Sequence, residues 1–152
     1  MADTPRDAGV DALAQFDSGM FCAESVVAAL APRLGVPAEV VVPAATGFCS
    51  GVARTGGMCG AVSGAIMAIG MAMGRTRPDE KVERGYGPVQ DLMARFAAEF
   101  GSTNCAELLG CHLGTPEGMQ TFRDAKLGTR CRAYTRRAAE LAAELVDARQ
   151  GG

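Results

Sequence analysis

The chain has 152 residues, of which 21% are charged and 48% hydrophobic, and its formal net charge is −2. This length and composition are typical of one globular domain and exclude a disordered or fibrous chain. The near balance of charge argues against a general nucleic-acid-binding protein, which usually has a strong basic excess. Two residue types are unusual: 20 glycines, about twice the average share, and 6 cysteines beside a single histidine.

The N-terminal segment MADTPRDAGVDALAQF has no apolar stretch long enough for a signal peptide, so a cytoplasmic location is expected. In that reducing compartment, cysteines are more often buried apolar residues, metal ligands or redox thiols than structural disulfides. Function is therefore to be sought among the cysteines.

Apolar residues recur with helical spacing along most of the chain. The predicted helices, in chain order, are residues 7–18, 21–34 ended by Gly35, 37–46 bent or ended by Pro43, 59–74, 88–100, 105–110 capped by Asn104 or Ser102, a helix that starts at Thr115–Pro116, and 129–149. The charged segment 75–88 is predicted as an exposed connection or a frayed helix, and EVVV at 39–42 is a weak strand candidate. The fold predicted for residues 1–152 is a compact, single-domain, all-α helical bundle.

The longest uncharged stretch runs from Thr55 to Gly74 and is about the length that spans a bilayer. It holds six glycines and few large apolar side chains, so a buried, soluble helix is favoured over a membrane helix. Gly60, Gly64 and Ala68 recur at every fourth position and would form a flat stripe against which another helix can pack closely. The prediction is a Gly/Ala-rich central helix and no membrane partner.

The cysteines contain no C-x-x-C spacing, which excludes the thioredoxin, zinc-ribbon and ferredoxin patterns. Four of them follow a glycine break and fall within about the first turn of a predicted helix: Cys22, Cys59, Cys105 and Cys131. Unpaired N–H groups and the helix dipole favour thiolates at such positions. Four converging helix starts could hold an iron–sulfur cluster or present low-pKa redox thiols. The alternative is that these cysteines are merely small buried residues.

Three residues near these cysteines could belong to the same site. Arg130 and Arg132 flank Cys131 and are candidates for stabilising a thiolate there. His112, the only histidine, is predicted to be a surface or capping residue rather than a metal ligand. Patterns for nucleotide binding, a Ser-His-Asp triad or paired catalytic carboxylates are not found in the sequence.

The segments CAESVVAAL (22–30), TGFCSGVARTGGMCGAVSGAIMAIG (46–70) and FAAEFGSTNCAELLG (96–110), with the cysteine at 131 before a long last helix, resemble a family of redox-active proteins. That family is named for a C, GCAxxG, C, C pattern, and the resemblance covers about residues 20–145. Its four cysteines would map onto Cys22, Cys59, Cys105 and Cys131. The central motif here reads CGAVSG, with the first two letters exchanged, and Cys49 and Cys111 are additions. Similarity to the helical domain of split-Soret cytochromes implies an iron–sulfur cluster by analogy, although their haem-attachment signatures are absent here.

The leading sequence-based hypothesis is a helical redox protein in which these four cysteines bind an iron–sulfur cluster and pass electrons to an unidentified partner protein. A second hypothesis is a metal-free thiol–disulfide protein with Cys59 as the nucleophile, because Cys59 follows a flexible Gly-Gly and opens a helix. A third is a structural zinc protein or an interaction module whose cysteines only pack. Enzymatic activity, the roles of Cys49 and Cys111, and a homo-oligomeric state are left open.

Overall fold

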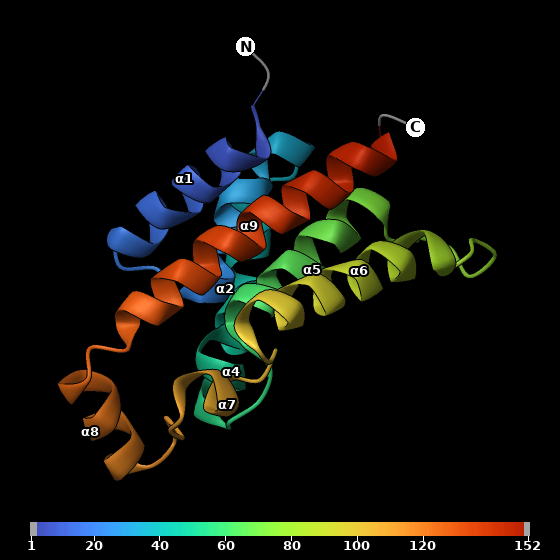
Figure 1. Cartoon of the computed structure of the whole chain (residues 1–152). Helices are drawn as coiled ribbons and strands as arrows, with labels where there is room; N and C mark the ends of the chain where they lie inside the picture. Colours follow the sequence, from blue (N-terminus) through green and yellow to red (C-terminus); the bar gives the residue numbers. More distant parts are fainter. Residues whose placement is uncertain (1–2, 151–152) are drawn as a thin grey trace.

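The structure of the chain is a computed structural model that describes residues 3–150, and this range is all-α, as predicted (Figure 1). The helices, in chain order, are α1 (Pro5–Asp17), α2 (Cys22–Leu30), α3 (Ala38–Ala45), α4 (Cys49–Arg54), α5 (Gly60–Met73), α6 (Glu83–Phe100), α7 (Cys105–Leu109), α8 (Pro116–Asp124) and α9 (Gly128–Gln150). Two short 3-10 turns lie at Pro32–Leu34 and Thr46–Phe48. The weak strand candidate at 39–42 lies inside α3, so that interpretation is wrong.

Local side-chain caps explain where several helices begin. Thr4 and Asp7 form a reciprocal capping box at the start of α1. The Asn104 side chain accepts the backbone N–H of Glu107 at 3.0 Å at the start of α7. Thr115 accepts the N–H of Gly118 at 2.9 Å at the start of α8. Each cap satisfies an N–H that has no partner within its own helix, and the predicted starts of α7 and α8 are confirmed.

Two helix boundaries, each near a proline, differ from the prediction. Helix α2 ends at Leu30, four residues before its predicted end, and the chain tightens into a 3-10 turn at Pro32 that ends on Gly35 in the left-handed conformation. Helix α6 begins at Glu83, five residues before the predicted start at Pro88. Pro88 has no N–H to donate, so one carbonyl in the first turn of α6 loses its hydrogen-bond partner within the helix. That turn is exposed, and the proline is therefore tolerated.

Helix α5 lies at the centre of the bundle, with α2, α6 and α9 packed around it and α1 covering α2 and α9 (Figure 1). Nine of its fourteen residues are buried. This matches the prediction of a buried Gly/Ala-rich central helix. Within residues 3–150, no helix is both long enough and apolar enough to cross a membrane.

The small-residue stripe of α5 faces α2. A Cβ added at Gly64 would lie 2.8 Å from the carbonyl oxygen of Ala23 and 3.0 Å from Cβ of Val26. Ala68, one turn further along, is fully buried. Backbone atoms of α2 therefore occupy the space that a side chain at Gly64 would need. This confirms the close helix packing predicted from small residues at every fourth position.

Replacing Gly64 by alanine is expected to destabilise the protein by about 1–3 kcal/mol, because the new methyl group would force α2 and α5 apart. Gly70→Ala is the matched control on the same helix, since no atom lies within 4 Å of its added Cβ. That substitution should instead stabilise by about 0.5–1 kcal/mol through helix propensity. Denaturant unfolding monitored by circular dichroism measures both, and equal effects of the two substitutions would contradict the packing.

Candidate cysteine site

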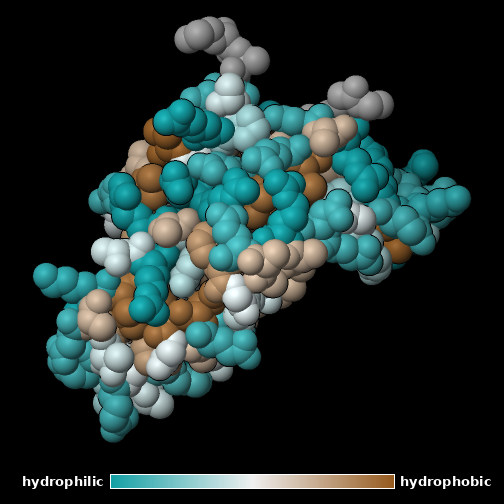
Figure 2. Space-filling model, viewed as in Figure 1, coloured by the Kyte–Doolittle hydropathy of each residue, from teal (hydrophilic) through white to brown (hydrophobic). Residues whose placement is uncertain are grey.

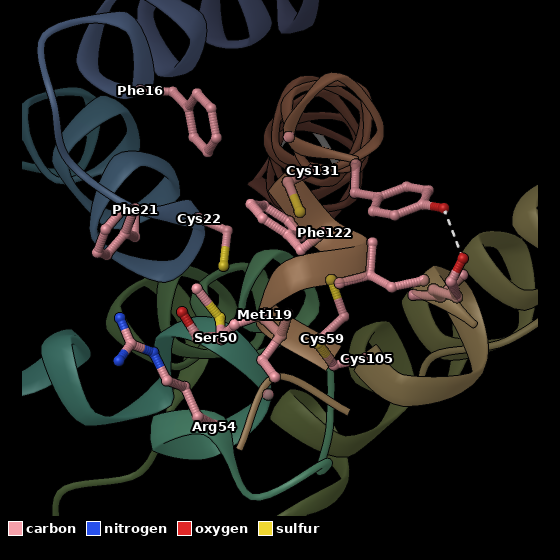
Figure 3. Close-up of a pocket in the computed structure, with 17 residues that line it drawn as sticks. Phe16, Phe21, Cys22, Ser50, Arg54, Cys59, Cys105, Met119, Phe122 and Cys131 are labelled. Carbon is pink, nitrogen blue, oxygen red and sulfur yellow. Dashed lines mark hydrogen bonds between the residues drawn. The ribbon is translucent and has the colours of Figure 1, made fainter. Parts of the chain in front are cut away.

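One end of the bundle contains a cavity of about 300 Å³, and four cysteines line it (Figure 3). Cys22 is the first residue of α2, Cys59 immediately precedes α5, Cys105 is the first residue of α7, and Cys131 lies in the first turn of α9. The structure therefore brings together the four cysteines that the sequence places at helix starts. All six cysteines of the chain have free thiols.

Backbone pairing fixes the position of two of these cysteines. The N–H of Cys59 donates to the carbonyl oxygen of Thr103, and the N–H of Cys105 donates to that of Gly57, both at 2.8 Å. A single antiparallel bridge between Met58 and Asn104 joins the same two loops. The loops that precede α5 and α7 are thus held side by side, although more than 40 residues separate them in the sequence.

Two glycines allow the cysteines to approach the neighbouring backbone closely. A Cβ at Gly60 would collide with Sγ of Cys22, and a Cβ at Gly51 would lie 2.6 Å from Cβ and 3.0 Å from Sγ of Cys105. Gly51 also has a φ of +68°, a conformation in which residues with a side chain are disfavoured. Glycine is required at both positions for the walls of the cavity to close around the thiols.

The segment α4 is a left-handed turn rather than a right-handed helix. Its five consecutive residues 50–54 have φ values between +54° and +68°, and four of them carry side chains. The left-handed conformation costs about 1–2 kcal/mol for each such residue. Hydrogen bonds from the N–H groups of Thr55 and Gly57 to the Gly51 carbonyl close the turn. Ser50 and Arg54 from this left-handed turn 50–54 line the cavity.

The rest of the cavity wall is apolar. Aromatic side chains come from α1, from the residue before α2, from α8 and from α9: Phe16, Phe21, Phe122 and Tyr134. Hydrophobic side chains gather at this end of the molecule (Figure 2). Among the described residues that line the cavity, Arg54 alone is charged. Sequence reasoning missed these wall residues, because they come from distant segments and share no local pattern.

Burial dominates the acid–base properties of the thiols. It raises the pKa of Cys59 and of Cys131 to about 12 each, and it also raises the pKa of Cys105. The first N–H groups of α5, those of Ala61 and Val62, lower the pKa of Cys59, but desolvation outweighs them. The prediction of low-pKa thiols at helix starts is wrong for these three cysteines.

The arginines beside Cys131 do not stabilise a thiolate there. Arg132 points to α1 and pairs with Asp17 through two hydrogen bonds of 2.8 and 2.9 Å. Arg130 reaches a backbone carbonyl at 3.5 Å. Neither arginine is among the groups that shift the pKa of Cys131. Side chains next to one another on a helix point in different directions. The prediction that Arg130 and Arg132 stabilise a thiolate at Cys131 is therefore wrong.

His112 is a surface residue, one of the two roles predicted for it, and it caps neither α7 nor α8. It is exposed, and its Nδ1 accepts the N–H of Gly114 at 3.0 Å in the loop between α7 and α8. The neighbouring Cys111 is half-buried and does not line the cavity. Cys49 is buried immediately before the left-handed turn and is not among the residues that line the cavity.

The thiols around the cavity bear on which metal group it could hold. In the part of the chain that the structure describes, no three side chains of histidine, cysteine, aspartate or glutamate are grouped so as to hold a metal ion. Four cysteine thiolates are the ligand set of structural zinc sites and also of iron–sulfur clusters. The four thiols that line the cavity of about 300 Å³ are therefore of the donor type that either group takes.

Comparison with known proteins agrees with this arrangement of cysteines. A family model described as Putative redox-active protein (C_GCAxxG_C_C) matches residues 20–145. No curated protein and no solved structure matches the chain significantly. The matched region contains all four cysteines of the cavity and most of the chain. The chain therefore belongs to the C_GCAxxG_C_C family of redox-active proteins.

Proposed function

We propose that this protein binds an iron–sulfur cluster in the cavity and passes electrons to a partner protein. The observation that carries the proposal is the convergence of four thiols on one cavity: Cys22, Cys59, Cys105 and Cys131. These residues would hold the cluster, and the cluster would supply reversible one-electron exchange.

The surroundings of the thiols support this role. The apolar walls limit the access of water, which is one of the factors that set the potential of a cluster. Arg54 places a positive charge at the cavity and would offset part of the negative charge of four thiolates. Metal binding would displace the protons that burial holds on the thiols.

The two alternative functions have less support. A metal-free mechanism with Cys59 as the nucleophile needs a thiolate, but a pKa of about 12 leaves only roughly one thiol in 10⁵ ionised at pH 7. A structural zinc site would take the same four thiolates, but zinc has no redox chemistry, whereas the family model is described as redox-active. The cluster remains the function that the cavity supports best.

Anaerobic reconstitution with iron and sulfide tests the proposal. We expect the wild-type protein to gain iron and acid-labile sulfide in equal amounts, with a broad visible absorption that dithionite bleaches. Replacing any one of the four cavity cysteines by alanine should lower the iron content sharply. Cys111→Ser is the matched control, because Cys111 does not line the cavity, and it should retain the wild-type iron content.

Circular dichroism of each variant separates loss of the cluster from loss of the fold. A reconstituted wild-type protein that stays colourless and free of iron would overturn the proposal. Equal iron in the wild type and the Cys59→Ala variant would exclude Cys59 as a ligand. Voltammetry of the reconstituted protein should show a reversible one-electron wave, which the iron-free protein lacks.

A further inference from the structure

Cys49 lies directly beside Cys22, although it does not line the cavity. The Cys49 thiol donates to the carbonyl oxygen of Ala45 at 3.8 Å, and the Cys22 thiol lies close enough to influence the pKa of Cys49. A Cβ placed on Gly60 would lie within 3.1 Å of both Sγ of Cys22 and Cα of Cys49, so the two cysteines converge on the same point. Their exposed fractions are 9% and 4%, and neither forms a disulfide.

Two further contacts hold the segment that precedes Cys49 against the start of α2. The Thr46 hydroxyl donates a hydrogen bond to the carboxylate of Glu24 at 2.8 Å. The backbone N–H of Glu24 in turn lies near the thiol of Cys49. A disulfide needs two cysteines whose backbones are already close. These contacts supply that proximity without a rearrangement of the helices.

We propose that Cys22 and Cys49 form a reversible disulfide when a low-molecular-weight disulfide enters the cavity, and that this bond withdraws Cys22 from the cluster. The first half of the proposal, formation of the disulfide, concerns the metal-free protein alone. The second half, the loss of Cys22 as a ligand, rests on the proposed function, because it assumes that Cys22 is a cluster ligand. The oxidised protein would then be unable to bind the cluster.

The two cysteines have different roles in the exchange. Cys22 lines the cavity, so it meets the oxidant first: its thiolate attacks one sulfur of the small disulfide and releases one thiol, leaving a mixed disulfide on Cys22. Cys49 then loses its proton and attacks the Cys22 sulfur, releasing the second thiol. One S–S bond forms in the protein and one breaks in the oxidant, and two electrons pass from the cysteines to it.

The first half is tested on the full-length, metal-free protein with hydroxyethyl disulfide. Unreacted thiols are alkylated, the protein is digested without reduction, and the peptides are identified by mass spectrometry. We expect a peptide that links Cys22 to Cys49 in the wild type. Cys49→Ser should instead leave the mixed disulfide on Cys22, and the Cys111→Ser control should form the same bond as the wild type.

A Cys22 that stays fully alkylatable, or that bonds equally well to another cysteine, would overturn the disulfide. Circular dichroism confirms that Cys49→Ser folds. If Cys49→Ser does not fold, the location of the bond in the wild type and in Cys111→Ser decides the question.

The second half is tested by reconstitution before and after oxidation. The oxidised wild type should take up no more iron than the Cys22→Ala variant, and dithiothreitol should restore uptake. Equal iron uptake by oxidised and reduced wild type would overturn the link to the cluster. A reduced wild type that takes up no iron would instead overturn the proposed function. The mapped disulfide would still establish the bond between Cys22 and Cys49 in the metal-free protein.

Discussion

Replacing Gly60 by alanine is expected to destabilise the protein by about 1–3 kcal/mol and to prevent cluster assembly. The added methyl group would collide with Sγ of Cys22, and it would lie 2.8 Å from the carbonyl oxygen of Phe48 and 3.1 Å from Cα of Cys49. The last two atoms belong to the backbone and cannot rotate away. The thiol of Cys22 must therefore leave its place in the cavity wall, or α5 must separate from α2.

Iron content after reconstitution and the free energy of unfolding measure the two effects of Gly60→Ala separately. Gly70→Ala is the control for adding the same methyl group to the same helix, because nothing lies near its Cβ. It should retain the wild-type iron content. An unchanged iron content in Gly60→Ala would show that the close approach of Cys22 to α5 is not needed by the site.

Replacing Phe96 by alanine is expected to lower the free energy of unfolding by about 3–5 kcal/mol, the range for large-to-small substitutions of buried aromatic residues. Phe96 is fully buried on α6. Its ring centroid lies 4.8 Å from that of Phe100 and 5.9 Å from that of Tyr134. Tyr134 lines the cysteine cavity, so the same substitution removes packing from behind one wall of the site.

Urea unfolding of the Phe96→Ala variant measures this loss, which would be a large share of the roughly 5–15 kcal/mol typical of a domain. Tyr86→Ala is the matched control, because Tyr86 is an aromatic residue on the same helix whose exposed fraction is 59%. It should change the stability by no more than about 0.5 kcal/mol. Similar losses in both variants would show that the aromatic cluster does not stabilise the core.

The boundaries of the helices were only partly predictable. Asn104 and Thr115 cap α7 and α8 as expected, since capping depends on residues two or three positions apart. Pro88 lies inside α6 rather than at its start, since a proline in the second turn of a helix removes only one hydrogen bond near its exposed end. The left-handed turn 50–54 gave no sequence signal, because four of its five residues are not glycine and take this conformation only in the folded protein.

The sequence by itself determined the all-α class, the buried central helix and the placement of Cys22, Cys59, Cys105 and Cys131 near helix starts. These features follow from periodicity, capping and glycine breaks, which act over a few residues. Only the tertiary structure decided that the four thiols share one cavity, that Cys49 lies beside Cys22, and that burial raises the thiol pKa values that helix starts alone would lower. Burial and thiol contacts depend on residues far apart in the chain, and no local pattern encodes them.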